Sequence, residues 1–436
     1  MRRIAFAIAM LITLTALGLA IPGPSRAAED ANPIAPGTKI TLSNWQQYKQ
    51  FMPDGLQGML AGKYVWKFPA DFEIVVGPTS HYPLPQTYLE ATKKNSALVK
   101  IADLPDGGHT ITGYVSGTPF PDPQQPMKGY KLLVDNWYRY MPHLICGDDG
   151  HQYLEDSFGS MTTSKYAMVD RRLSHIAEKD QPTDDPRAEG VDLSEWELVL
   201  EPEQLKYTET LTLYYTDPSK PEDDFVFVPS LRRVIRESPS SRCAPAYGSD
   251  FIFDDFRGGF NGGIARFDAD YLRDQSILSL VNAQPAVYGY KTNYDSLFFP
   301  KPVIGSWEVR STSIIDVQRI PSMRSGYCYG KQIMWIDKYS YQLLWKDIYN
   351  QKMEFIKTAM CNHIASPVPD EGTQFETENE VETFWSLDHQ HLSAWITSGG
   401  GGQGNVANSA CRNLSGVNYD DIERYSTVSG LNQSMR

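Results

Sequence analysis

Hydrophobic and polar positions alternate most clearly between residues 331 and 358, and this pattern predicts β-structure. We expect three strands, at 331–336, 341–348 and 353–358. The intervening residues, Asp337-Lys338-Tyr339-Ser340 and Asn350-Gln351-Lys352, are of types that favour turns. Because short turns join neighbouring antiparallel strands, the three should lie side by side in chain order.

The strand predicted at 341–348 carries apolar residues on both faces. Strict alternation places Tyr341, Leu343, Trp345 and Asp347 on one face, and Gln342, Leu344, Lys346 and Ile348 on the other. A strand that is apolar on both sides needs both sides covered. We therefore expect helices to cover one face of the sheet and expect the other face to be shielded from water.

Further elements follow from similar patterns. Strands are predicted at 208–216, 223–228, 232–236 and 305–317. Helices are predicted at 42–52, with a capping-box pattern at Ser43 and Gln46, at 84–95, and around Tyr130–Tyr138, where apolar residues recur at helical spacing. The predicted class is mainly β with α, with helical segments at about 40–140 and a mainly β part at about 150–395.

The N-terminus has the three parts of a secretory signal. Met1-Arg2-Arg3 is positively charged, residues 4–21 are apolar, and Ser25-Arg26-Ala27 places small residues where a signal peptidase reads them. We expect cleavage after Ala27 and a periplasmic mature protein of residues 28–436, forming a single domain. No cysteine lies near this site to carry a lipid.

Charge and hydropathy restrict the partners. The full chain has a formal charge of −13, and removing Arg2, Arg3 and Arg26 with the signal makes it −16. An acidic protein of this kind does not suit nucleic acid, which needs clustered Lys and Arg. After the signal, no apolar stretch is long enough to span a bilayer. We expect a soluble protein without a transmembrane segment in its mature chain.

The five cysteines are Cys146, Cys243, Cys328, Cys361 and Cys411. None of them form a C-x-x-C pair, which argues against zinc and thioredoxin-like sites. In an oxidising compartment one or two disulfides are expected, and the spacing leaves their pairing open.

Familiar catalytic motifs are missing. The sequence has no G-x-S-x-G, H-E-x-x-H or P-loop. Gly399–Gly404 is read as a loop rather than a nucleotide site. His389 and His391 could offer two imidazoles to a metal, but no third ligand is evident, so neither a metal nor another cofactor is predicted. Asp254-Asp255 with Arg257 is interpreted as a glycine-rich turn held by an ion pair. A hydrolase using Asp254, Asp255 and His389 is the least favoured function.

Several stretches resemble a bacterial family of unknown function described as outer-membrane lipoprotein-sorting-protein-like. They are PGTKITLSNWQQY, FMPDGL, LPQTYLEATKKN, GYVSGTPFPDPQQPMKGYKLLVDNWYRY, DDFVFVPSLRRVIR, GSDFIFDDFRGGFNG and YGKQIMWIDKYSYQLLWKDIYNQKMEF. The last is also similar to the Ile-Asp-turn-strand-Asp pattern of LolA and LolB carriers. The cysteines and the tail after Ala407 depart from the family pattern. The resemblance implies a large, curved antiparallel sheet, an unclosed β-barrel, with helices on its concave side.

The resemblance also implies a hydrophobic cavity for acyl chains. We predict a non-enzymatic protein that binds or carries a hydrophobic, lipid-like ligand, with envelope transport proteins as possible partners. The hypothetical lining residues are Trp335, Leu343, Trp345 and Phe355; ordinary core packing is the alternative for each. A binding or assembly component of an envelope complex is the alternative function.

Overall fold

A computed structural model describes residues 33–435 except 239–241, 284–289, 376–380 and 397–404. The predicted signal at 1–27 and the glycine run at 399–404 lie outside the described residues. Among the residues described, no helix is long and apolar enough to cross a membrane.

One antiparallel sheet of 14 strands dominates the molecule and is not closed into a barrel. The strands lie in the order β10-β9-β8-β7-β6-β5-β19-β18-β15-β14-β13-β12-β11, and β20 pairs with β5. Their bounds are Leu144–Glu155 (β5), Met161–Arg172 (β6), Val191–Glu201 (β7), Glu209–Tyr215 (β8), Asp223–Val228 (β9), Arg233–Arg236 (β10), Phe267–Ser279 (β11), Glu308–Arg319 (β12), Lys331–Asp337 (β13), Leu343–Tyr349 (β14), Phe355–Asn362 (β15), Val381–Ser386 (β18), His391–Ile396 (β19) and Val406–Ala407 (β20). This confirms the predicted fold class.

The predicted meander is confirmed, with one correction to its faces. Strands β13, β14 and β15 are adjacent in chain order. The register runs from Trp335 opposite Trp345 directly to Ile336 opposite Leu343, so Leu344 is an extra residue in a β-bulge. The bulge breaks the alternation. Leu343 joins the core on one side of the sheet and Trp345 the core on the other, so the prediction that they share a face is wrong.

The remaining strands pair in three small sheets: β1 (Lys39–Thr41) with β2 (Glu73–Val75), β3 (Lys100–Asp103) with β4 (His109–Thr112), and β16 (Ala365–Val368) with β17 (Gly372–Phe375). The α-helices are α1 (Asp54–Leu60), α2 (Gln86–Asn95), α3 (Lys128–Trp137), α4 (Phe256–Gly259), α5 (Tyr290–Asn293), α6 (Ile422–Tyr425) and α7 (Val428–Leu431).

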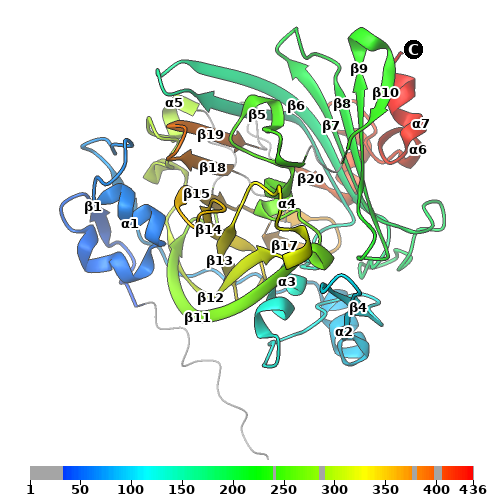
Figure 1. Cartoon of the computed structure of the whole chain (residues 1–436), viewed down its shortest axis with the longest axis horizontal. Coiled ribbons are helices and arrows are strands. Elements are labelled where there is room, and N and C mark those ends of the chain that lie inside the picture. Colours follow the sequence, from blue (N-terminus) through cyan, green and yellow to red (C-terminus); the bar gives the residue numbers. More distant parts are fainter. Residues whose placement is uncertain (1–32, 239–241, 284–289, 376–380, 397–404, 436) are drawn as a thin grey trace, which may run out of the picture.

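Both faces of the sheet are covered, as its two-sided apolar strands require. Figure 1 shows the sheet curving around α4, with β1 and α1 on one side of the molecule and α6 and α7 on the other. Helix α3 and residues 246–267 pack in the concave side, where Trp137 and Phe260 belong to the same core as Met334. Residues 34–76 and 294–309 cover the outer face of β12–β19.

The helix predicted at 42–52 is a shorter 3₁₀-helix, Trp45–Phe51. Its predicted capping box does not form, because the Ser43 hydroxyl pairs with the Thr41 hydroxyl (2.9 Å) and no side chain caps the helix. The other two predicted helices correspond to α2 and α3.

Two disulfides join distant parts of the chain. Cys146 of β5 is bonded to Cys411, 265 residues away, and Cys243 is bonded to Cys328; Cys361 is a buried free thiol. The first bridge attaches the C-terminal tail to the outer face of β5–β9. There the side chains of Tyr419 and Leu431 pack into an apolar core.

Candidate ligand-binding site

A cavity of about 90 Å³ lies on the concave side, between strands β6–β8 and residues 246–261, which we call the inner segment. On the strand side it is lined by Tyr166, Met168, Asp170, Glu195, Trp196, Glu197, Thr210 and Thr212. On the other side the inner segment contributes Tyr247, Phe251, Phe253, Phe256, Arg257, Gly258 and Asn261, and strands β18 and β19 add Glu382 and Trp395. The inner segment therefore supplies most of the aromatic side chains of the wall, and strands β6–β8 supply most of its polar and charged ones.

Strand alternation decides which residues reach the cavity. On β6, Tyr166, Met168 and Asp170 line it, whereas Ala167 and Val169 lie in the outer core beneath the C-terminal tail. Successive side chains of a strand point to opposite faces, so one strand serves both. The disulfide-linked tail thus covers the back of the cavity wall.

The inner segment approaches the sheet closely because it contains glycines in the left-handed region. Gly258 and Gly259 have φ values of 69° and 92°. A Cβ on Gly259 would lie 2.5 Å from Cδ2 of Leu343, so a larger residue would push the segment off β14. Gly259 thus allows the backbone of the inner segment to lie directly against the Leu343 side chain.

Buried ion pairs hold the inner segment in place. Asp254 is fully buried and accepts hydrogen bonds from Arg242 Nε (2.6 Å), Arg319 Nη2 (2.7 Å) and the Tyr327 hydroxyl (2.7 Å). Burial alone would raise the pKa of Asp254, but the charges of Arg242 and Arg319 outweigh it and lower the pKa to about 2. Asp254 is therefore an ionised anchor.

Asp255 forms a second anchor, which joins the inner segment to β14. Its carboxylate accepts hydrogen bonds from Lys346 Nζ (2.6 Å) and from the Tyr329 hydroxyl (2.8 Å). Lys346 also donates to the carbonyl of Gly259 (2.7 Å), so one buried lysine holds both ends of α4. Neither Asp254 nor Asp255 pairs with Arg257 in the way the sequence suggested. The Arg257 guanidinium lies over the Trp137 ring, 4.2 Å from its centre.

Two carboxyl groups of β7, those of Glu195 and Glu197, are among the polar groups that line the cavity. Glu197 lines the cavity and is half-buried; loss of water around its carboxyl, together with the negative charge of Glu195, outweighs a hydrogen bond from Tyr247 and raises its pKa to about 8. At neutral pH Glu197 is mostly protonated and can donate a hydrogen bond. The cavity thus offers an aromatic wall beside several polar groups, which include the charged side chains of Asp170, Glu195 and Arg257; this suits a molecule with an apolar part and a polar end.

The four residues predicted to line a cavity lie elsewhere. Trp335 and Trp345 face each other across β13 and β14 in the outer core. Trp345 is fully buried, donates its indole N–H to the carbonyl of Leu278 (3.0 Å), and lies 6.2 Å from the Trp307 ring. Phe355 is half-buried, with its ring 5.8 Å from that of Tyr64. Leu343 packs on the concave side under Gly259.

None of these four residues is among those that line the cavity described above. Their contact with a ligand stays a prediction. The residues suggested for a hydrolase are also held apart by their partners, since Asp254 and Asp255 lie in the two anchors whereas His389 lies beside Asp250.

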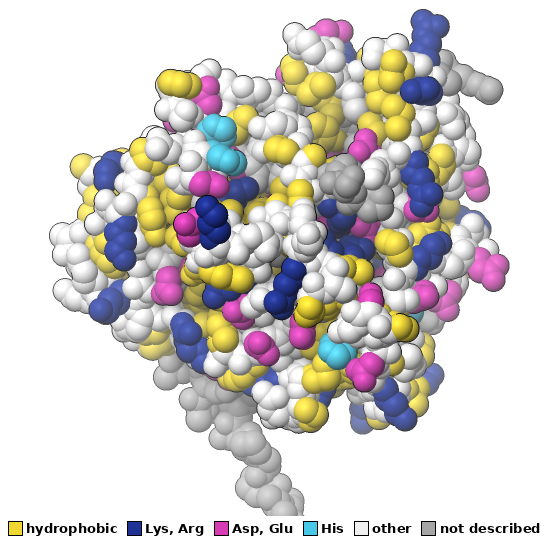
Figure 2. All heavy atoms as spheres, viewed as in Figure 1, with side chains coloured by type: hydrophobic (Ala, Val, Ile, Leu, Met, Phe, Trp, Pro, Cys, Tyr) yellow, Lys and Arg dark blue, Asp and Glu magenta, His cyan; other side chains and the backbone are white. Residues whose placement is uncertain are grey.

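A larger hollow of about 810 Å³ lies where the two ends of the sheet approach each other. Its wall includes Glu222, Arg242, Arg266 and Arg319. These groups are already engaged in ion pairs, among them Arg266 Nη1 with Glu222 (2.6 Å). A charged wall of this kind does not suit an acyl chain. On the face shown in Figure 2, hydrophobic side chains are scattered among polar ones. The inner cavity is therefore a better candidate site for an apolar ligand than the larger hollow or this surface.

The class and the family of the protein follow from this architecture and from comparison with known proteins. The chain is an open, curved antiparallel sheet that wraps around an inner segment. Residues 39–409 match the model of a family described as "protein of unknown function (DUF1329)", and the chain belongs to this family. This confirms the resemblance found in the sequence. A search of curated proteins finds no significant match.

Solved structures with some similarity include three bacterial proteins. A family member from Desulfovibrio piger is 14% identical, with 71% of this chain and 100% of that chain covered and a TM-score of 0.47. A Vibrio parahaemolyticus domain assigned to outer membrane lipoprotein sorting is 16% identical (62% and 90% covered, TM-score 0.43). A LolA superfamily protein from Nitrosomonas europaea is 13% identical (60% and 86% covered, TM-score 0.36).

Proposed function

We propose that this protein is exported to the periplasm and binds a hydrophobic, lipid-like ligand in the cavity beneath the inner segment. The observation that carries the proposal is the aromatic wall of Tyr247, Phe251, Phe253 and Phe256 facing the concave side of the sheet. The predicted signal and the two disulfides support an oxidising compartment.

The size of the cavity determines how such a ligand enters. A cavity of about 150 Å³ holds a benzene molecule, so the present volume of about 90 Å³ accommodates only a smaller apolar group. Phe253 and Phe256 line the cavity and are half-buried, so part of each ring is exposed to solvent. Binding a whole acyl chain requires these two rings to turn outward. The protonated Glu197 would then meet the polar end of the ligand.

Blocking the cavity should abolish uptake. In the variant Thr210→Trp, an indole from β8 would occupy the space between the strands and the inner segment, since Thr210 lines that space. We expect binding of a fluorescent fatty acid to fall at least about tenfold, because about 1.4 kcal/mol of lost contact corresponds to that factor.

The matched control is Thr162→Trp, the same substitution at an exposed position of β6. This variant should bind like the wild type. If the wild-type protein takes up no fatty acid, phospholipid or sterol, the ligand proposal fails, and a role in assembling an envelope complex becomes the better account. Equal uptake by Thr210→Trp and wild type would place the ligand elsewhere.

A further inference from the structure

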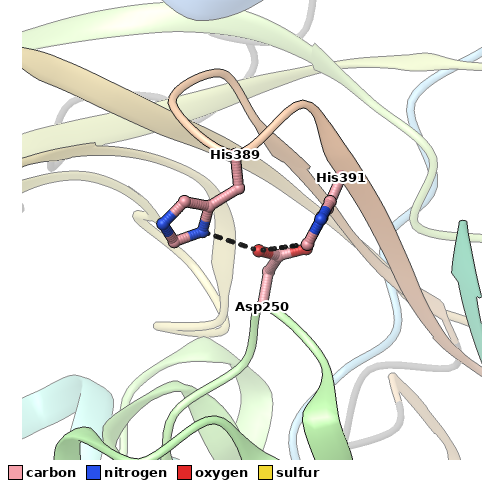
Figure 3. Close-up of side chains that lie close together, drawn as sticks. All are labelled: Asp250, His389 and His391. Carbon is pink, nitrogen blue, oxygen red and sulfur yellow. Dashed lines mark ion pairs between the residues drawn. The ribbon is translucent and has the colours of Figure 1, made fainter. Parts of the chain in front are cut away.

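Asp250, His389 and His391 come together at the edge of the concave side, although the sequence places Asp250 far from the two histidines. His389 lies in the turn between β18 and β19, His391 begins β19, and Asp250 belongs to the inner segment. Figure 3 shows the two imidazole rings on either side of the carboxylate. One potential ligand atom from each residue lies within 4.8 Å of the other two.

The spacing of these atoms matches a coordination shell better than hydrogen bonding. Asp250 Oδ1 is 3.5 Å from His389 Nδ1 and 3.7 Å from His391 Nδ1. Both distances exceed the usual range of an N–H···O bond. Around a tetrahedral Zn²⁺ with bonds of about 2.0–2.1 Å, neighbouring ligand atoms stand about 3.3 Å apart. The three groups are therefore close to the arrangement that a cation would complete.

The carboxylate is oriented by groups that do not themselves reach the histidines. Ser393 Oγ donates to Asp250 Oδ2 (3.0 Å) and accepts from the Asp250 backbone N–H (2.9 Å). Lys357 Nζ donates to the Asp250 carbonyl (2.8 Å). Ser393 is fully buried and the Asp250 side chain is 2% exposed, so the two are rigidly placed. Hydrogen bonds of this kind hold a metal ligand in its productive orientation.

We propose that Asp250, His389 and His391 bind one divalent transition-metal ion, with Zn²⁺ as the best fit. Two imidazoles and one carboxylate form a nitrogen-rich donor set, which favours zinc and its neighbours over Ca²⁺ or Mg²⁺. The ion reaches the site from solvent past His389, whose side chain is 60% exposed. Its charge offsets that of the nearly buried carboxylate. The bound ion joins the β18–β19 turn to the inner segment, next to Phe251 of the cavity wall.

Calorimetric titration of the untagged, chelator-treated protein with ZnCl₂ tests the site. We expect one Zn²⁺ per chain for the wild type and at least about a hundredfold weaker binding for His391→Ala. Ser393→Ala, which removes only the supporting hydroxyl, should weaken binding about 10–100-fold. A titration with Co²⁺ should give the visible absorption of a low-coordinate nitrogen and oxygen site, and His391→Ala should remove it.

Two further variants keep the result interpretable. His389→Ala changes an exposed side chain, so it should fold normally and still lose zinc. The control His109→Ala removes another histidine beside a carboxylate, the His109–Asp103 pair (3.0 Å), and should bind zinc like the wild type. Absence of stoichiometric binding by the wild type would overturn the proposal. Equal binding by wild type, His389→Ala and His391→Ala would do so as well.

Discussion

Replacing Asp254 with asparagine is expected to lower the free energy of unfolding by about 3 kcal/mol. The substitution removes the negative charge that faces Arg242 and Arg319, both buried. Breaking a buried ion pair from one side costs about 3–5 kcal/mol because the remaining charge is left without its partner. The lower end applies because Arg242 also contacts Glu222. Urea denaturation at pH 7 measures the difference.

The matched control is Asp223→Asn: Asp223 is half-buried and also accepts a hydrogen bond from Tyr215, but its charged partner Arg236 is 66% exposed and stays solvated when the pair is broken. An exposed pair contributes less than about 1 kcal/mol. A loss of stability in Asp254→Asn no larger than in the control would show that the anchor of the inner segment is unimportant.

The same carboxyl predicts how stability changes in acid. The folded-state pKa of Asp254 is about 2, below its ordinary value of 3.8. A lowered pKa means that its contribution is complete above about pH 4 and disappears as the pH falls toward 2. The contribution amounts to about 2 kcal/mol. The difference in the free energy of unfolding between the wild type and Asp254→Asn should therefore become smaller as the pH falls from 4 to 2.

Trp345→Ala is the second substitution with a large expected effect. Trp345 is fully buried in the outer core, and its indole N–H bonds to the carbonyl of Leu278. Truncating a buried tryptophan costs about 3–5 kcal/mol through lost burial and the space left behind. Thermal or urea unfolding should show this loss, whereas the folded fraction should still bind a fluorescent fatty acid with nearly unchanged affinity.

Phe256→Ala should behave in the opposite way. Phe256 is half-buried and lines the cavity, so its truncation should weaken ligand binding while costing less stability than Trp345→Ala. The opposite result would be loss of ligand binding in Trp345→Ala and its retention in Phe256→Ala. It would show that the ligand contacts the residues suggested by the sequence rather than the inner cavity.

The sequence predicted the three strands between residues 331 and 358 well. It did not predict which of their residues share a face of the sheet. Residues 331–358 alternate regularly and have short turns, so three adjacent strands could be predicted. The bulge at Leu344 could not, because it depends on how β13 and β14 pair rather than on any residue pattern. One extra residue reverses the faces that follow, and this separated Leu343 from Trp345.

The candidate sites were hidden for a different reason. The cavity combines alternate residues of β6–β8 with the inner segment, and charged residues such as Glu195 and Glu197 obscure the strand pattern there. The aromatic residues between Tyr247 and Phe256 were the available signal. Likewise, His389 and His391 were recognised as possible ligands, but Asp250 reaches them only through the folding of the inner segment. Contacts between distant parts of a chain are not encoded in local spacing.

The most direct test of ligand binding is mass spectrometry of organic extracts from protein purified natively from the periplasm. Wild type, Thr210→Trp and Thr162→Trp should be compared at equal amounts. We predict one class of lipid-like molecule that co-purifies with the wild type and the exposed-site control and is depleted in Thr210→Trp. Extracts of the wild type that contain no such molecule, or equal amounts in all three proteins, would contradict binding in the inner cavity.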